Sequence, residues 1–238
     1  MSDLRIIDGS AVSVAGYRWF RGLVILFAIV LAGFASWIVA AELLRPIPVA
    51  FPTDPEAASD FSQNRIAARH AARAGIVRGD LWSEYALTFA DVFRREDRSA
   101  ATTKNSAMIQ QSHDIAERAL ALAPYDARIW LLLASLRSRF DWLNGKASSA
   151  VRMSYYTGAN EIALIPVRLA LALSLPSITD KDFQQLVGRD LRIAVTRHAE
   201  LKPAILTAYK YALPEGQEFV RGALKDLDPN LLTQQPQK

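Results

Sequence analysis

The stretch GLVILFAIVLAGFASWIVAA, residues 22–41, decides how this chain is built because it holds no charged side chain. A helix of about 20 residues is about 30 Å long, which matches the hydrocarbon core of a bilayer. Eleven of its residues are Leu, Ile, Val or Phe, and each of these favours insertion. We therefore predict a single transmembrane helix over residues 22–44.

The charges that flank this run predict its orientation. Arg5, Arg18 and Arg21 precede it, whereas Arg45 alone follows it closely. Basic residues next to a membrane span are retained on the cytoplasmic side. We expect residues 1–21 to be a cytoplasmic tail, and the main domain to be periplasmic and tethered to a bacterial inner membrane.

A cleaved signal peptide is the rival interpretation of the same run. Val39-Ala40-Ala41 before Glu42 has the small side chains of a cleavage site. However, the apolar run is longer than a usual signal core, and the bulky Trp37 lies close to the expected cut. Both interpretations export the same domain.

Small residues recur at every fourth position of the predicted span: Ala28, Ala32, Ser36 and Ala40. This spacing places them on one ridge, where a second helix could approach closely. The alternative is that the ridge faces lipid, because alanine is common throughout the chain.

Composition limits the function classes. The 238 residues include 28 Lys plus Arg, 24 Asp plus Glu and no Cys, so disulfides, thiolate nucleophiles and Cys-based metal sites are excluded. The basic residues are scattered among acidic ones, whereas nucleic-acid binding needs a concentrated basic patch. We expect the membrane as a partner and no nucleic acid.

The chain after the apolar run divides into three parts. Residues 45–55 contain four prolines, which favour an extended spacer. Residues 56–227 show helical periodicity and no sustained alternation, which predicts an all-α domain. Residues 228–238 are polar and are expected to fray.

Apolar residues at helical spacing predict individual helices in this domain. They fall within residues 81–93, 108–123, 129–140, 162–175 and 183–194. The fourth of these ranges is apolar but too short to span a membrane, so we predict a buried core helix there. Thr179 with Asp182 resembles a helix-start cap for the last.

The stretch ALALAPYDARIWLLLAS, residues 119–135, resembles the junction between two tetratricopeptide repeats. The residues that carry the likeness are Ala119, Pro124, Trp130, Leu133 and Ala134, with Trp82, Tyr85, Ala86 and Phe89 matching the helix of a preceding repeat. The spacing between the two parts exceeds the family's 34-residue period. The resemblance covers residues 80–163 and implies helical hairpins.

A second resemblance lies in residues 152–173, RMSYYTGANEIALIPVRLALAL. This segment is similar to one in bacterial inner-membrane proteins with repeat-like helices that accompany extracellular polysaccharide production. The likeness is carried by Tyr155, Tyr156, Gly158, Asn160 and Glu161. It implies an association with polysaccharide biosynthesis or export but specifies no chemistry.

No catalytic constellation, phosphate loop or dinucleotide fingerprint occurs in the sequence, so we expect no cofactor and no enzyme. His113 and Glu117 are one turn apart on a predicted helix, a spacing that can place two metal ligands together. A third ligand is missing nearby, and we interpret the pair as a solvated helix face without a metal.

The candidate binding site is a groove lined by the first helix of each hairpin. By this register Arg128, Ser135 and Arg139 project into it, and Tyr155, Tyr156 and Arg168 join them. Arginine and tyrosine suit acidic or sugar-rich partners, although solvated arginines and core tyrosines are the simpler explanation for any single position.

The expected function is a non-enzymatic membrane-anchored scaffold or adaptor for a cell-envelope complex, one that makes or exports polysaccharide. Its expected partners are other envelope proteins and an acidic polysaccharide. Two alternatives stay open. One is an accessory subunit that contacts its partners through the transmembrane helix, and the other is an unrecognised periplasmic enzyme.

Overall fold

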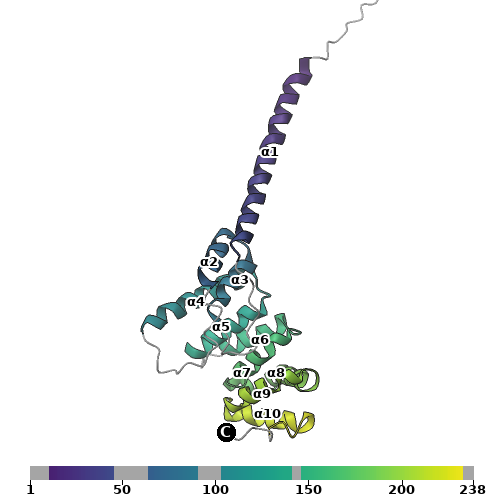
Figure 1. The fold of residues 1–238 in the computed structure, drawn as a ribbon. Helices are drawn as coiled ribbons and strands as arrows, with labels where there is room; N and C mark the ends of the chain where they lie inside the picture. The colour runs from purple at the N-terminus through teal and green to yellow at the C-terminus, as the bar shows by residue number, and fades with distance from the viewer. Residues whose placement is uncertain (1–10, 46–63, 91–102, 141–145, 233–238) are drawn as a thin grey trace, which may run out of the picture. The chain divides into compact units, whose positions relative to one another are not determined.

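The computed structural model describes residues 11–45, 64–90, 103–140 and 146–232; for residues 11–16, 103–106, 139 and 140 it describes the backbone alone. Every regular element in these ranges is a helix (Figure 1), which confirms the predicted all-α class. The chain forms two compact units, Met1–Leu44 and Arg45–Lys238.

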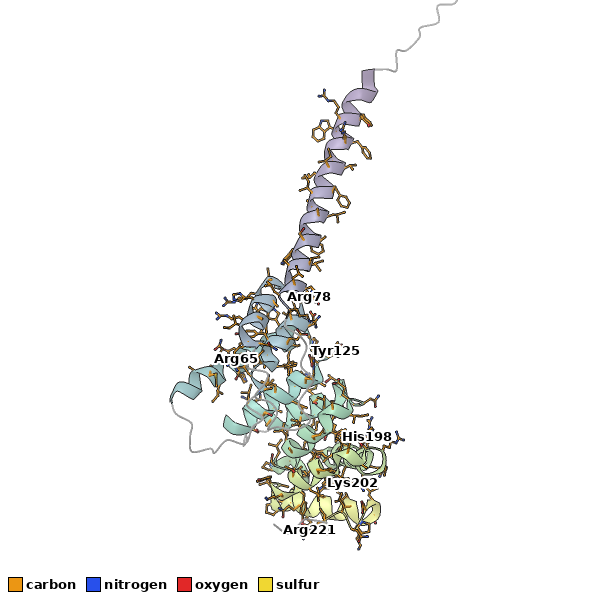
Figure 2. All side chains as sticks on the ribbon, in the orientation of Figure 1. Arg65, Arg78, Tyr125, His198, Lys202 and Arg221 are labelled. Atoms are coloured by element: carbon orange, nitrogen blue, oxygen red, sulfur yellow. The ribbon has the colours of Figure 1, made fainter. Side chains whose placement is uncertain are left out.

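The first unit contains one long helix, α1, from Ala11 to Leu43. Its segment Tyr17–Leu43 has 27 residues and a mean hydropathy of 2.7, and its large apolar side chains point outward all round it (Figure 2). At 1.5 Å per residue this segment is about 40 Å long, enough to cross a bilayer. The helix is compatible with a membrane anchor or with a signal sequence.

Helix α1 begins eleven residues before the predicted start of the span. Residues 11–21, which we expected in a cytoplasmic tail, form its first three turns. They contain no proline, and Gly16 is their one strongly unfavourable residue, so nothing in this segment ends the helix. Residues 1–10 of the expected tail lie outside the described residues.

In the described part of the second unit, the first helices pack on their neighbours in chain order. They are α2 (Arg65–Ala74), α3 (Gly79–Leu87), α4 (Thr103–Leu122), α5 (Ala127–Phe140) and α6 (Lys146–Thr157). Small side chains allow close approach: Ala68 and Ala72 of α2 and Ala116 and Ala119 of α4 are all buried. Helices are thus stacked against one another as hairpin-like neighbours.

The rest of the second unit is built around α7 (Ile165–Ala172), which packs against α5, α6, α8 and α9. The other elements are the 3₁₀ turns η5 (Ile162–Leu164), η6 (Pro176–Thr179) and η7 (Ala199–Leu201), with α8 (Lys181–Arg197), α9 (Lys202–Lys210) and α10 (Pro214–Leu227). Pro166 lies in the first turn of α7, where its missing N–H breaks no helical bond. The predicted buried core helix is therefore confirmed.

The cap of α8 differs from the predicted one by a residue. The Oδ1 atom of Asp180 accepts a hydrogen bond from the backbone N–H of Asp182 at 2.9 Å. Thr179 belongs to the preceding 3₁₀ turn, and its hydroxyl donates to the Pro176 carbonyl at 3.1 Å. Asp180 has the extended backbone of an N-cap residue, so its side chain reaches the free N–H groups.

The predicted frayed tail over residues 228–238 is wrong in its first part. Asp228 Oδ2 accepts a hydrogen bond from Lys202 Nζ at 2.9 Å, and Leu231 is buried in the core. Burial of this leucine holds the chain against the unit. Residues 233–238, like residues 46–55 of the predicted 45–55 spacer, lie outside the described residues.

Candidate functional site

The residues predicted to line a groove do not share one open surface. Arg128, on α5, is half-exposed but engaged by Asp126 through two hydrogen bonds, 3.0 Å from Nε to Oδ1 and 2.7 Å from Nη2 to Oδ2. Burial favours a higher pKa for the Asp126 carboxyl, but the hydrogen bonds and charge of Arg128 hold that pKa below its usual value. The guanidinium of Arg128 is therefore already hydrogen-bonded to Asp126, two residues before it in the chain.

Four further groove candidates lie in different surroundings. Ser135 and Tyr155 are buried in the core, which corrects the expectation that they project into a groove. Both lie on the buried face of their helix, where they pack against neighbouring helices. Tyr156 is exposed, whereas the side chain of Arg139 lies outside the described residues.

Arg168 corrects the groove prediction most clearly, because it is fully buried. Its Nε donates to Ser154 Oγ at 3.0 Å, and its Nη2 donates to the carbonyls of Ser154 at 2.8 Å and Gly158 at 2.6 Å. These carbonyls lie at the C-terminal end of α6 and also accept backbone hydrogen bonds from the N–H groups of Gly158 and Glu161. The guanidinium therefore adds a charged donor at the negative end of the helix dipole. Arg168 is thus an internal clamp between α7 and α6.

Asp190, on α8, is the charge that faces this clamp. Its Oδ2 lies 3.7 Å from Arg168 Nη1, and both side chains are almost inaccessible to solvent. Burial raises the pKa of Asp190 to about 6, although the neighbouring guanidinium opposes the rise. Burial likewise raises the pKa of Tyr155 well above its usual value. The cluster joins α6, α7 and α8.

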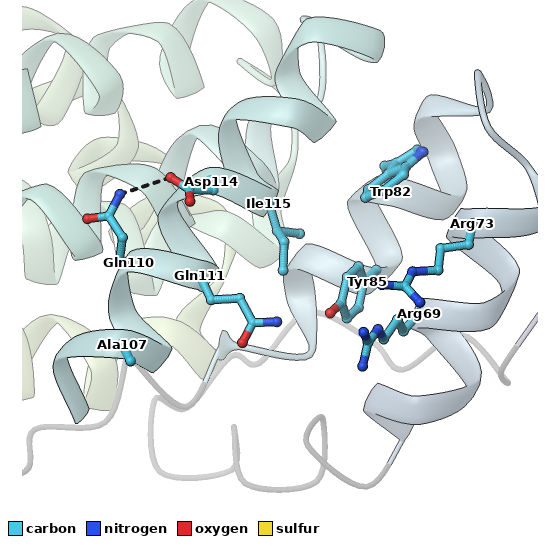
Figure 3. A pocket seen from close by; sticks show the side chains of 9 residues that line it. All are labelled: Arg69, Arg73, Trp82, Tyr85, Ala107, Gln110, Gln111, Asp114 and Ile115. Carbon is cyan, nitrogen blue, oxygen red and sulfur yellow. Dashed lines mark hydrogen bonds between the residues drawn. The ribbon is translucent and has the colours of Figure 1, made fainter. Parts of the chain in front are cut away.

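A pocket of about 480 Å³ opens between α2, α3 and α4 (Figure 3). Helix α2 contributes Arg69 and Arg73, α3 contributes the edges of Trp82 and Tyr85, and α4 contributes the opposite wall. That wall consists of Ala107, Gln110, Gln111, Asp114 and Ile115. We call this the α2–α4 pocket.

The two arginines of the α2–α4 pocket are one helical turn apart and exposed. Among the described residues, no carboxylate forms an ion pair with either of them. The one acidic residue of the lining, Asp114, accepts a hydrogen bond from Gln110 at 2.9 Å on the far wall. Two uncommitted guanidinium groups beside an apolar floor can bind a carboxylate or phosphate through paired hydrogen bonds.

The structure of the floor fixes where these arginines stand. Ala68, Ala71 and Ala72 pack α2 closely onto α3, so the next positions round the helix face the pocket. Arg118 lies over the Trp82 ring with 4.3 Å from Cζ to the ring centroid, and the Trp82 indole donates to the Ile76 carbonyl at 3.1 Å. The floor is therefore held rigidly from both sides.

Sequence reasoning missed this pocket. The arginines of RIAARHAARAG could be seen as a basic helix face from their four-residue spacing, but Trp82 and Tyr85 looked like ordinary core residues. The residues of the far wall follow the two arginines by more than 30 positions in the chain. A pocket made of three helices depends on which helix faces meet, and periodicity within one helix does not contain that information.

His113 and Glu117 lie together on α4, as their spacing predicted, with 3.5 Å between His113 Nε2 and Glu117 Oε1. Arg137 of α5 also binds Glu117, at 3.2 Å. No group of three or more potential ligands gathers in the part of the chain that the structure describes. The pair therefore contributes to the contact between α4 and α5.

The small residues of α1 stand on one exposed ridge. Ala28, Ala32, Ser36 and Ala40 are all exposed, and the Ser36 hydroxyl donates to the Ala32 carbonyl at 2.7 Å. This hydroxyl is satisfied inside its own helix, so it needs no partner in lipid.

The fold and the pocket define a class: an all-helical protein with one N-terminal helix apolar enough to cross a membrane and a helical unit that carries a basic pocket. No family model, no curated protein and no solved structure matches this chain.

Proposed function

We propose that this protein is a non-enzymatic, membrane-anchored adaptor whose α2–α4 pocket holds an anionic group of another envelope protein. The complex it serves would be one that makes or exports polysaccharide. The single observation that carries the proposal is the pair Arg69 and Arg73, two exposed cations without an ion-pair partner among the described residues, at the mouth of a pocket with an apolar floor.

The chemistry of this pair favours docking. An exposed, already paired arginine adds little to binding because its charge is satisfied, as at Arg128. Two arginines one turn apart, with no ion-pair partner in the part of the chain that the structure describes, offer two planar donor groups at once. The Trp82 side of the floor is already held by contacts to Arg118 and Ile76, which limits reordering when a ligand enters. Acidic side chains of a partner fit these donors best.

The anchoring part of the proposal rests on α1 and its flanking charges. We propose that Tyr17–Leu43 spans a bacterial inner membrane, with Arg18 and Arg21 toward the cytoplasm and the second unit in the periplasm. A tether confines the pocket to a thin layer beside the membrane. Confinement raises the effective concentration of membrane partners without adding a contact.

The test is co-purification from gently solubilised membranes. The variant Arg69→Glu/Arg73→Glu is expected to lose the partners that the wild-type chain retains, because two donors become two acceptors. Identification of the retained proteins by mass spectrometry is the readout.

A matched control separates this effect from a change of overall charge. Arg192 and Arg221 are also exposed, and they lie on α8 and α10, away from the pocket. Arg192→Glu/Arg221→Glu changes the net charge equally and should keep the partners. Loss of partners in the control, or retention in the pocket variant, would contradict the proposal.

An acidic polysaccharide is a second candidate ligand for the same pocket. The amide of Gln111 extends from the α4 wall toward the side of the arginines (Figure 3), and amides suit sugar hydroxyls while guanidinium groups suit uronate carboxylates. Titration with a uronate oligosaccharide tests this candidate. Equal heat from the wild-type chain and the Arg69→Glu/Arg73→Glu variant would count against it.

A contact through α1 is the alternative to docking in the pocket. The ridge of Ala28, Ala32, Ser36 and Ala40 is exposed along the helix, and close helix packing needs such small residues. Ala32→Leu/Ser36→Leu would dissolve a complex held by this ridge. If that variant loses its partners and the pocket variant keeps them, the alternative replaces the adaptor proposal.

A further inference from the structure

The loop between α2 and α3 displays two aliphatic side chains to solvent. Ile76 is 51% exposed and Val77 is 71% exposed. The loop that carries them is well held: the Trp82 indole donates to the Ile76 carbonyl at 3.1 Å, and the Gly75 N–H donates to the Ala71 carbonyl at 2.8 Å. A rigid loop thus keeps adjacent apolar side chains in contact with water, at a cost that burial in another apolar medium would relieve.

The same end of the second unit binds Arg45. The Arg45 Nε lies 2.9 Å from Oε1 and 3.0 Å from Oε2 of Glu84, and its Nη1 lies 3.8 Å from Asp80 Oδ2. Asp80 also accepts a hydrogen bond from Arg78 at 2.6 Å. Arg78 directly follows Val77 and precedes α3, so the loop and the Arg45 site share the start of this helix.

The covalent chain limits how far this site can be from a membrane. Arg45 follows Leu43, the last residue of the apolar segment, by two residues. Two residues extend over at most about 7 Å. If Tyr17–Leu43 spans a bilayer, Arg45 lies close to the interface, and so do Asp80 and Glu84, the α3 residues that bind it.

The chemistry of the loop suits that interface. Aliphatic side chains insert into the boundary between headgroups and acyl chains, and nearby cations are attracted to anionic headgroups. Arg73, exposed on the last turn of α2, supplies such a cation beside the loop. If the loop faced only water, the side chains of Ile76 and Val77 would have no apolar partner.

We propose that Ile76 and Val77 insert into the headgroup region of the membrane that holds α1, so that the second unit docks on an anionic lipid surface through its α2–α3 loop. This inference rests on the membrane anchoring in the proposed function and shares Arg73 with the α2–α4 pocket, but the insertion of Ile76 and Val77 does not depend on what the pocket binds. The partner of the exposed loop side chains is lipid.

The absence of cysteine from the chain permits a direct test on the full-length protein. Val77→Cys, labelled with an environment-sensitive fluorophore, is reconstituted in vesicles of phosphatidylcholine and phosphatidylglycerol. Arg221→Cys, exposed on α10, is the matched control, and Gly33→Cys reports insertion of α1 because no atom lies within 4 Å of its added Cβ. Lipids with a quencher near the headgroup read position 77, lipids with a quencher deep in the acyl chains read position 33, and aqueous iodide reports exposure to water.

The expected result is that lipid quenching at position 77 exceeds that at position 221 by about twofold or more, with iodide access reduced to match. Quenching at position 33 but not at position 77 would overturn this inference and leave the anchoring intact. Protection of position 77 from iodide without lipid quenching would overturn it too, because a protein would then cover the loop. No lipid quenching at position 33 would overturn both the anchoring and the inference.

Discussion

At the scale of single residues, burial decides what each arginine does. Arg168 and Arg69 are both arginines on helices with many alanines nearby, yet one is fully buried and the other exposed. Arg168 donates hydrogen bonds to Ser154 and Gly158 and forms an ion pair with Asp190. Arg69, in contrast, has no ion-pair partner among the described residues. A buried guanidinium can support the fold, and an exposed uncommitted one can bind a ligand.

Removal of the buried arginine should be costly. Arg168→Met leaves Asp190 buried without its cation and removes a charged donor from the last carbonyls of α6, so we expect the free energy of unfolding to fall by about 3 to 5 kcal/mol. Arg189→Met is the control, because Arg189 is exposed and reaches Asn160 at 3.0 Å, and it should cost less than about 1 kcal/mol. Thermal unfolding of the full chain in detergent measures both, and equal losses would contradict the clamp.

Asp190 should make stability depend on pH. Its folded pKa of about 6 exceeds the unfolded value of 3.8, so the native state binds this proton more tightly than the unfolded state. Its contribution is therefore fully present below the unfolded pKa and is lost as pH rises through about 6, by about 2 to 3 kcal/mol. Asp190→Asn should remove this part of the pH dependence. Unchanged curves for the two chains would show that Asp190 is not shifted.

At the scale of elements, local signals explain most helices, and exceptions have a local cause. Pro166 and Pro214 lie in first turns of α7 and α10, where proline is compatible with a helix. The structure has Asp180 as the cap of α8, whereas the sequence predicted Thr179. The reason is that Asp180 has the extended backbone from which a side chain reaches the free N–H groups. Such one-residue differences depend on backbone angles that residue types alone do not specify.

Two glycines of α10 predict opposite outcomes for the same substitution. A Cβ at Gly216 would lie 2.5 Å from the Leu173 carbonyl oxygen, a backbone atom that cannot turn aside. Gly216→Ala should therefore lower the free energy of unfolding by about 1 to 3 kcal/mol. Gly222 has nothing within 4 Å, so Gly222→Ala should raise it by about 0.5 to 1 kcal/mol. Thermal unfolding compares the pair, and equal signs would contradict the close approach of α10 to α7.

At the scale of the whole molecule, the chain consists of an apolar helix and a packed helical unit with separate roles. The unit buries a continuous core around α7 and α8, while α1 leaves its apolar side chains exposed. A helix with such a surface is compatible with a membrane anchor or with a signal sequence. The helices of the second unit bury one another's apolar faces in that core.

Topology and anchoring are testable in cells. Two reporter enzymes can be fused after Lys238, one active only in the periplasm and one active only in the cytoplasm. We expect activity from the first and none from the second. The full chain should also stay in the membrane fraction after carbonate extraction, with the intact mass of 26.3 kDa. A soluble product that begins at Glu42 would instead identify α1 as a cleaved signal peptide.

The sequence by itself determined the all-α class, the apolar N-terminal helix and the presence of a buried core helix within residues 162–175. These follow from periodicity and from runs of apolar residues, which act within one helix at a time. Tertiary structure decided that Arg168 is buried. It also decided that Arg69 and Arg73 line the same pocket as Trp82 and the wall of α4. It also decided that Leu231 packs into the core. The reason is that helix faces find their partners through contacts between residues far apart in the chain, and hydrophobic burial selects among many possible pairings that local pattern leaves equivalent.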